Sequence, residues 1–345
     1  MRTILVMAAM LWTNVVCCGG EDTNKPANHL VIHADQGKNV INKNIYGQFA
    51  EHLGRCIYDG IWVGQDSNIP NINGIRKDVV DALKKIQVPF VRWPGGCFAE
   101  LYHWRYGVGP VSERPSLGNV NGEIETNQFG THEFMQFCEL IDTEPMLCAN
   151  VGNGTPQELY DWFSYMTRDD TTLAAERRKN GRIKPWKVGL LCVGNENCGC
   201  GGMMTAETYA NKYRTYQYFG TLIGGSQIFR IASGPIWDDY AWTENVMKTA
   251  AAFMDGLSFH YYSVNPFNVQ GGFKGNKSAI KFDESTWHET MYQSLRIEEL
   301  MLKHLAVMEK YDPEKKVALM VDEWGTWYEA EPNSSGCYQE NTIRD

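Results

Sequence analysis

Two glutamates, Glu196 and Glu323, stand where apolar, β-prone runs give way to polar or aromatic residues. The runs cover residues 189–193 and 317–321. Because barrel enzymes place their chemistry at the carboxyl ends of parallel strands, both carboxylates occupy positions typical of an active site. Cleavage of a glycosidic bond needs two such groups, one to donate a proton and one to attack or to act as a base. The pair therefore predicts a hydrolase with paired carboxylates.

The residues around each glutamate suggest different roles. Asn195 precedes Glu196 and offers a neutral amide that can hydrogen-bond a sugar hydroxyl. Trp324 follows Glu323 in an aromatic stretch that could face a sugar ring. If Arg92 reaches Glu323, it would favour the ionised form that a nucleophile needs, although a purely structural ion pair is the alternative. Glu196, beside that anion, would then favour the protonated form that an acid needs.

Strands and helices are expected to alternate along the chain. Apolar runs predict strands at residues 45–50, 88–93, 145–151, 188–193, 228–232, 256–262 and 317–323, with a further short strand at 31–33. Periodic apolar residues predict helices at 75–86, 132–141, 155–165, 205–221, 242–254 and 287–311. This alternation is typical of an α/β fold, here a (β/α)₈ TIM barrel that lacks its last strand. Glu196 and Glu323 would end its fourth and seventh strands.

A nucleotide-binding fold and a nucleic-acid partner are both disfavoured. The segment at residues 107–110 lacks the third glycine of a dinucleotide fingerprint, and no phosphate-loop motif is present. A net charge of −9 provides no basic stripe to neutralise phosphates. A neutral, carbohydrate-like substrate fits this charge better, and the 11 Trp and 17 Tyr could supply stacking faces for sugars.

The first residues suggest an exported protein. Residues 1–18 have one early positive charge, Arg2, and an apolar run of signal-peptide length, so they predict a weak signal peptide. Cys17 and Cys18 leave a lipoprotein as a weaker alternative. We expect residues 19–40 to be a linker with a strand of an accessory β-sandwich and residues 41–345 to form the catalytic barrel, incomplete at its C-terminus. No other segment is predicted to span a membrane.

The ten cysteines do not predict a disulfide framework. Cys97, Cys148 and Cys192 lie in or beside strand-like runs, where a free cysteine behaves as a small hydrophobic residue. Cys198 and Cys200 lie close to Cys192, but their spacing is not that of a structural zinc site. Buried thiols are therefore expected rather than metal ligands.

Five ordered segments of the chain resemble the α-L-arabinofuranosidases of glycoside hydrolase family 51. They are residues 45–64 (IYGQFAEHLGRCIYDGIWVG), 91–110 (VRWPGGCFAELYHWRYGVGP), 126–134 (TNQFGTHEF), 194–202 (GNENCGCGG) and 321–328 (VDEWGTWY). The resemblance implies a retaining exo-glycosidase that releases terminal α-L-arabinofuranosyl residues from arabinan, arabinoxylan and oligosaccharides. It also implies no cofactor or metal, and homo-oligomers in the full-length form.

The resemblance further assigns residues. Glu196 would be the acid/base and Glu323 the nucleophile. The residues implied to bind the terminal sugar are Glu51, Arg92, Cys97, Asn195, Tyr262 and Trp327. Structural roles stay open for several of these, such as a strand-end salt bridge for Glu51. His260 is expected to be a structural histidine rather than a proton carrier.

Three features depart from the family pattern. Cys198 stands where tryptophan is common, residues 116–125 form a short segment without an expected tryptophan, and the eighth strand and most of the β-sandwich are absent after residue 345. Because a missing strand leaves unpaired edges, we expect the 345-residue chain alone to be unstable or inactive. Two other functions stay open: an endo-glycanase of the same clan, which the loops between residues 104 and 130 would decide, and an inactive carbohydrate-binding relative.

Overall fold

The computed structural model describes residues 30–119, 122–224, 227–263, 278–329 and 331, and the chain divides into two compact units, Met1–Ile41 and Asn42–Asp345. In the first unit, the described residues form one short 3₁₀ helix, η1 (Ala34–Gln36). Residues 31–33, predicted as a strand, are not in a strand here: they pair with no described strand, and the side chains of Val31 and Ile32 are exposed. The accessory β-sandwich to which they were assigned stays a prediction. The predicted signal peptide lies outside the described residues.

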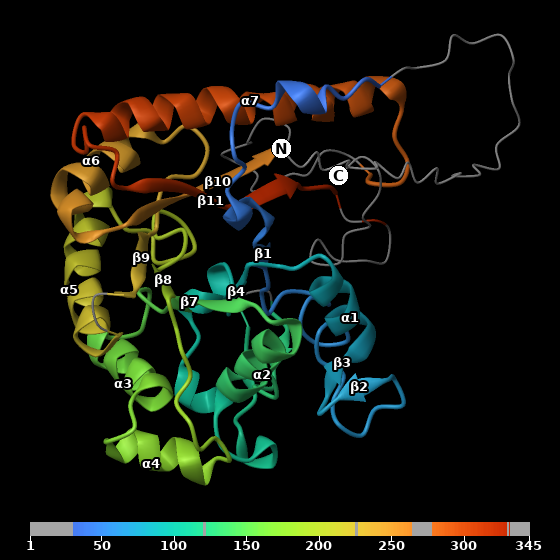
Figure 1. Ribbon diagram of the computed structural model, residues 1–345, viewed down its shortest axis with the longest axis vertical. Helices are drawn as coiled ribbons and strands as arrows, with labels where there is room; N and C mark the ends of the chain where they lie inside the picture. Colours follow the sequence, from blue (N-terminus) through green and yellow to red (C-terminus); the bar gives the residue numbers. More distant parts are fainter. Residues whose placement is uncertain (1–29, 120–121, 225–226, 264–277, 330, 332–345) are drawn as a thin grey trace, which may run out of the picture. The chain divides into compact units, whose positions relative to one another are not determined.

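The second unit is built on a seven-stranded parallel sheet that nearly closes into a barrel (Figure 1). Its strand order follows the sequence: β1 (Gln48–Phe49), β4 (Phe90–Trp93), β7 (Glu144–Ala149), β8 (Leu190–Val193), β9 (Phe229–Ala232), β10 (Gly256–Ser263) and β11 (Ala318–Thr326). Each predicted barrel strand is present, so the predicted TIM-barrel architecture with seven strands is confirmed. Among the described residues, β1 and β11 are the edges of this sheet.

Helices follow the strands and pack on the sheet and on one another (Figure 1). The six predicted helices appear as α1 (Lys77–Lys85), α2 (Thr131–Ile141), α3 (Pro156–Thr167), α5 (Ala206–Gly224), α6 (Tyr240–Ala250) and α7 (Glu284–Glu309). The unpredicted α4 (Thr172–Lys179) has a polar sequence without a clear apolar period. It is anchored instead by Arg177, whose buried guanidinium donates to the backbone oxygens of Tyr165 and Arg168.

Short 3₁₀ helices and hairpins complete the unit. The 3₁₀ helices are η2 (Lys43–Tyr46), η3 (Cys97–Glu100), η4 (Trp104–Gly107), η5 (Val111–Glu113) and η7 (Ala251–Phe253). Two antiparallel strand pairs lie outside the main sheet: β2 (Asn71–Ile72) with β3 (Ile75–Arg76), and β5 (Leu117–Gly118) with β6 (Ile124–Glu125). No helix in the described part of the chain combines the length and apolar character needed to cross a bilayer.

Local sequence explains where α3 and α5 begin and which face of α5 is buried. The hydroxyl of Thr155 accepts from the backbone N–H of Glu158 at 3.1 Å, which caps the start of α3. Thr205 caps α5 in the same way through Thr208 N at 3.2 Å. Tyr209, Tyr213 and Tyr216 of α5 recur at helical spacing and are buried. Burial of these side chains stabilises the packing of α5 on the rest of the unit, including β8, the strand that precedes Glu196.

Candidate active site

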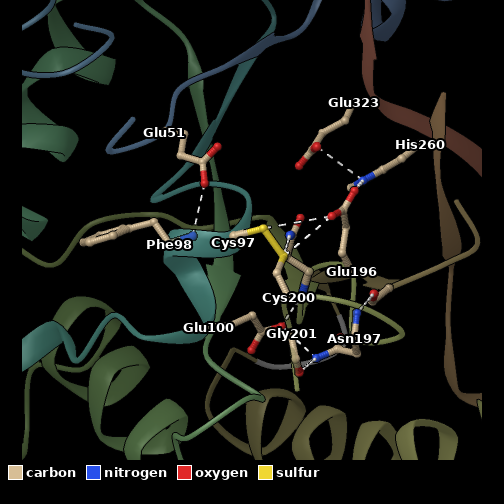
Figure 2. The surroundings of a disulfide bond; sticks show 12 residues. Glu51, Cys97, Phe98, Glu100, Glu196, Asn197, Cys200, Gly201, His260 and Glu323 are labelled. Carbon is tan, nitrogen blue, oxygen red and sulfur yellow. Dashed lines mark hydrogen bonds and ion pairs between the residues drawn. A yellow bond between two sulfur atoms is a disulfide. The ribbon is translucent and has the colours of Figure 1, made fainter. Parts of the chain in front are cut away.

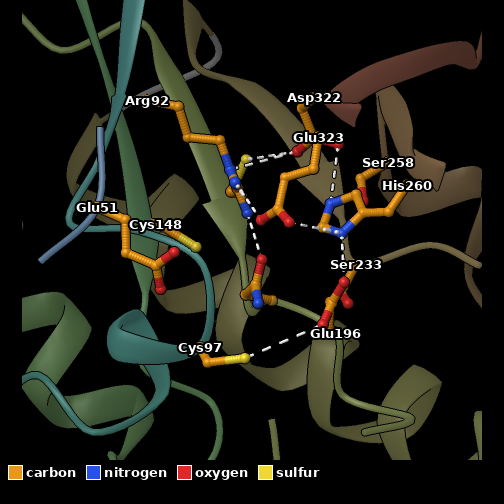
Figure 3. A network of polar contacts seen from close by, with 12 residues as sticks. Glu51, Arg92, Cys97, Cys148, Glu196, Ser233, Ser258, His260, Asp322 and Glu323 are labelled. Carbon is orange, nitrogen blue, oxygen red and sulfur yellow. Dashed lines mark hydrogen bonds and ion pairs between the residues drawn. The ribbon is translucent and has the colours of Figure 1, made fainter. Parts of the chain in front are cut away.

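The two glutamates predicted from the sequence meet above the carboxyl ends of the strands (Figure 3). Glu196 follows β8, and Glu323 lies within β11. One carboxylate oxygen of each lies within 4.8 Å of the other, and both approach the same ring nitrogen of His260. The side chain of Glu196 is 17% exposed and that of Glu323 only 6% exposed, so an incoming ligand can reach the first more easily. The fold thus brings together two acids that are far apart in sequence.

A β-bulge in β11 places two consecutive acids on the same side of the strand. Phe259 pairs with Val321 but His260 pairs with Glu323, so Asp322 is the extra residue of the bulge. In a regular strand, neighbouring side chains point to opposite faces. Here, Asp322 and Glu323 both contact Arg92 and His260. The next residue, Trp324, is 68% exposed and does not face these groups.

Arg92, at the end of β4, is the buried cation of the site. Its Nη1 donates to Glu323 Oε1 at 2.8 Å, its Nη2 donates to Asn195 Oδ1 at 2.5 Å, and its Nε lies 3.3 Å from Asp322 Oδ2. Burial disfavours the charged guanidinium, but Asp322 and Glu323 outweigh it and raise the pKa of Arg92 well above its usual range. The predicted contact between Arg92 and Glu323 is present.

His260 bridges the three acids of the site. Its Nδ1 lies 2.8 Å from Glu196 Oε1 and 3.3 Å from Glu323 Oε2, and its Nε2 lies 3.2 Å from Asp322 Oδ1 (Figure 3). Burial opposes its charging, but the negative charges of Glu323 and Asp322 raise the pKa of His260 well above its usual value. A charged imidazole therefore offsets the repulsion between the carboxylates. Sequence reasoning missed this contact, although His260 and Tyr262 share one face of β10 by strand alternation.

The backbone that carries Glu196 is strained and tightly held. Glu196 itself has φ of 42°, which non-glycine residues adopt rarely. Its carbonyl accepts from Gly199 N at 2.8 Å and from Gly201 N at 3.1 Å. Before it, Asn195 N donates to the buried carboxylate of Glu100 at 2.5 Å. No sequence pattern pointed to this carboxylate, which links the loop after β8 to η3.

Cys97 and Cys200 form a disulfide beside Glu196 (Figure 2). The expectation that Cys97 and Cys200 are free buried thiols is wrong, because the fold brings together these two cysteines, 103 positions apart, with their Cα atoms 5.6 Å apart. Cys148 and Cys192 are free and buried, as predicted. Within the described residues, two groups bring three potential metal-ligand atoms within 4.8 Å of one another: Cys97 with Glu196 and Cys200, and Glu196 with His260 and Glu323. In the first group, the two sulfurs are bonded to each other.

The remaining residues expected to bind the sugar lie around the two glutamates. Tyr262 donates its hydroxyl proton to Glu323 Oε2 at 2.8 Å, and its ring centroid lies 6.0 Å from that of Trp327. Glu51 is buried and accepts from Phe98 N at 3.1 Å. Burial, and then the nearby charge of Glu323, raise the pKa of Glu51 to about 7. Tyr262 and Glu51 therefore both lie close to Glu323, and Trp327 packs beside Tyr262.

Comparison with known proteins identifies the relatives of the chain. The family model described as the alpha-L-arabinofuranosidase 1 domain matches residues 82–271. A protein from Bacteroides ovatus, named intracellular exo-alpha-L-arabinofuranosidase, is 51% identical over 92% of this chain and 62% of its own length. Alpha-L-arabinofuranosidase C from Emericella nidulans is 36% identical over 88% of this chain and 61% of its own length. The chain thus spans about three-fifths of the length of these relatives.

Solved structures agree with this assignment. The family 51 arabinofuranosidase from Xanthomonas axonopodis pv. citri is 50% identical, with a TM-score of 0.85 over 90% of this chain and 63% of that chain. An arabinose complex of the alpha-L-arabinofuranosidase from Thermotoga maritima is 34% identical, with a TM-score of 0.72 over 84% of this chain and 56% of that chain.

The comparisons also correct one expectation. The export predicted from residues 1–18, whether as a secreted protein or as a lipoprotein, is contradicted by the Bacteroides ovatus relative, which is named an intracellular enzyme. The prediction of export depended on the length and apolar composition of residues 1–18. These features were not sufficient to predict the cellular compartment correctly. The family assignment does not depend on that segment, because the matched family domain lies within residues 82–271 and covers more than half of the chain. On this evidence, the chain belongs to the α-L-arabinofuranosidases of glycoside hydrolase family 51.

Proposed function

We propose that this protein is a retaining exo-α-L-arabinofuranosidase in which Glu196 is the acid/base and Glu323 the nucleophile. The observation that carries the proposal is the approach of the two carboxylates, whose nearest oxygens lie within 4.8 Å of each other. Retaining glycosidases place their carboxyl groups roughly 5–5.5 Å apart, whereas inverting ones leave roughly 6.5–9.5 Å for a water molecule. The short gap favours direct attack by one carboxylate on the sugar.

The surroundings of each acid support the assignment of roles. Glu323 receives hydrogen bonds from Arg92 Nη1 and from the hydroxyl of Tyr262, both at 2.8 Å, and these bonds hold its carboxyl group in place for attack on the sugar. Glu196 contacts none of the described arginines or lysines and is the more exposed of the two, so it can reach both the leaving group and water. Its contact with His260 fixes the direction in which the carboxyl group points.

The reaction would then proceed in two displacements. Glu323 attacks the anomeric carbon while Glu196 gives its proton to the leaving oxygen, so the glycosidic bond breaks and an arabinosyl ester forms. Glu196 next takes a proton from water, the water oxygen attacks the anomeric carbon, and Glu323 is released. Glu51, Arg92, Cys97, Asn195, Tyr262 and Trp327 are proposed to surround the sugar. Arabinan, arabinoxylan and their oligosaccharides are the proposed substrates, and no cofactor is required.

The purified full-length protein should hydrolyse an aryl α-L-arabinofuranoside. Proton NMR during the first turnovers should show arabinose released with the α configuration of the substrate, and inversion would contradict the double displacement. From linear arabinan, only arabinose should appear at early times, since an exo-acting enzyme cuts one terminal residue at a time. Early release of longer oligosaccharides would instead support the endo-glycanase alternative.

A further inference from the structure

The disulfide lies directly against the proposed acid/base. Cys200 Sγ is 3.6 Å and Cys97 Sγ is 4.0 Å from Glu196 Oε2 (Figure 2). In the disulfide, neither sulfur carries a hydrogen, so these are contacts of van der Waals type. Among the described residues, the polar atom that both sulfurs contact is Glu196 Oε2, a carboxylate oxygen with a proposed role in the reaction.

The sulfur pair can be reduced where it lies. Cys200 is exposed, so a small dithiol can attack its sulfur. The reaction breaks the bond between the two sulfurs, passes two electrons and two protons to Cys97 and Cys200, and converts the dithiol into its cyclic disulfide. Reduction therefore places two thiols beside Glu196.

Two thiolates and a carboxylate are a ligand set for a soft divalent cation. Zinc prefers four ligands in a tetrahedron, at about 2.3 Å to sulfur and about 2.0–2.2 Å to oxygen, which puts neighbouring sulfur and oxygen ligands about 3.6 Å apart. The observed distance of 3.6 Å from Glu196 Oε2 to Cys200 Sγ equals this edge, and the 4.0 Å distance to Cys97 Sγ exceeds it by about 0.4 Å. The two sulfurs would have to separate to about 3.8 Å, and Cys97 Sγ would have to move slightly closer to Glu196 Oε2. With Cα atoms 5.6 Å apart, side-chain rotations can supply that movement.

We propose that reduced Cys97 and Cys200, together with Glu196, form a binding site for a thiophilic divalent cation such as Zn²⁺, and that the bound cation blocks the carboxylate of Glu196. The cation would occupy the oxygen lone pair that has to accept and donate the catalytic proton. The inhibitory part of this inference rests on the proposed function of Glu196, whereas the binding part does not. The oxidised pair cannot bind the cation, because its sulfurs are engaged with each other.

The competing metal site in the same region predicts a different behaviour. Glu196, His260 and Glu323 also bring three ligand atoms within 4.8 Å of one another, but they contain no sulfur. A cation held there would bind equally well before and after reduction of the disulfide. The redox state of one protein sample therefore distinguishes the two sites without any substitution.

Metal binding is tested by competition with a chromogenic zinc chelator, on full-length protein that is either oxidised or reduced with dithiothreitol and desalted without air. The reduced protein should bind one additional Zn²⁺ per chain, at least about 100-fold more tightly than the oxidised protein. Losing a residue that only supports a metal ligand costs about 10–100-fold in affinity, and oxidation removes two direct ligands. Cys200→Ser should abolish this gain. Cys198→Ser is the matched control, because Cys198 is a free, half-buried thiol of the same loop that packs on the core. Equal binding in both redox states, or binding insensitive to Cys200→Ser, would overturn the site.

Inhibition is tested separately in the same samples. Stoichiometric Zn²⁺ should abolish hydrolysis of an aryl α-L-arabinofuranoside by the reduced protein, leave the oxidised protein unaffected, and be reversed by EDTA. Retained hydrolysis in reduced protein with a full zinc site would overturn the inhibitory part. A different result would contradict the proposed function itself. If Glu196 is not the acid/base, metal-free Glu196→Ala should hydrolyse substrates with poor leaving groups as fast as the wild type.

Discussion

Glu100 provides the sharpest test of how the acid/base loop is held. Its Oε1 accepts from Asn195 N at 2.5 Å and from Asn197 Nδ2 at 2.8 Å. Its Oε2 accepts from Val151 N at 2.7 Å and from Gly152 N at 2.5 Å. The carboxylate is 1% exposed, so water cannot replace it as an acceptor. We therefore predict that Glu100→Gln, which preserves shape, destabilises the protein strongly.

The magnitude follows from the number of donors. A glutamine amide has one oxygen, so its NH₂ group faces two of the four N–H donors and leaves them unsatisfied. Each buried unsatisfied donor costs about 1–3 kcal/mol, which gives about 2–6 kcal/mol in total. Since domains are stable by only about 5–15 kcal/mol, the loss should be large in any unfolding experiment. Hydrolysis should also slow, because Asn195 immediately precedes Glu196.

Urea unfolding at pH 8 measures this loss. Burial raises the pKa of Glu100 to about 7, against the opposing pull of the backbone N–H groups of Asn195, Gly152 and Val151, so the carboxyl is ionised at that pH. The matched control is Glu113→Gln, because the same change at this exposed carboxylate should alter the free energy of unfolding by less than about 0.5 kcal/mol. A loss below about 1 kcal/mol for Glu100→Gln would refute the reasoning.

Three further predictions concern the groups around the nucleophile. Tyr262→Phe removes the hydrogen bond to Glu323 Oε2, worth about 1.5–3 kcal/mol when one partner is charged. Steady-state kinetics should show kcat lower by about 10–100-fold, and the loss of this bond should also lower Tm by several degrees. Burial alone would raise the pKa of Asp322, but the charge of Arg92 outweighs burial and the net pKa is lowered. The ionised form of Asp322 therefore stabilises the fold. In urea unfolding, the destabilisation by Asp322→Asn should be largest at neutral pH and should shrink as the pH falls below about 4. Glu51 behaves in the opposite way, because its pKa is raised from 4.5 to about 7. Between these pH values, the wild type should lose up to about 3 kcal/mol of stability relative to Glu51→Gln as the pH rises; a constant difference would contradict the burial of this carboxyl.

The sequence predicted the barrel because its signals are local. Apolar runs of strand length recur between helical periods, and each of the seven barrel strands lies where such a run predicts it. The candidate acids were found by the same logic, since Glu196 and Glu323 follow or end those runs. The strand predicted at residues 31–33 is not formed in the described structure. A strand needs a pairing partner, and an apolar run does not guarantee one.

The missed parts of the site depend on long-range geometry. A register shift between β10 and β11 turns Asp322 towards Arg92, and no residue type in that stretch marks the bulge. The pairing of Cys97 with Cys200 could not be read from spacing, because only the fold brings these positions together. Glu100 lies in a short 3₁₀ helix, and its carboxylate is buried by contacts with the loops that follow β7 and β8. These contacts join distant parts of the chain, so the local sequence does not indicate them.

The central claim, that Glu196 and Glu323 act as acid/base and nucleophile of a retaining enzyme, is tested most directly by azide rescue. In Glu323→Ala, azide should attack the anomeric carbon from the vacant face and yield arabinosyl azide of inverted configuration. In Glu196→Ala, azide should instead attack the arabinosyl ester on Glu323 and yield the azide of retained configuration. NMR of the two products distinguishes these outcomes. The same product from both variants, or unchanged hydrolysis by Glu323→Ala without azide, would contradict the assignment.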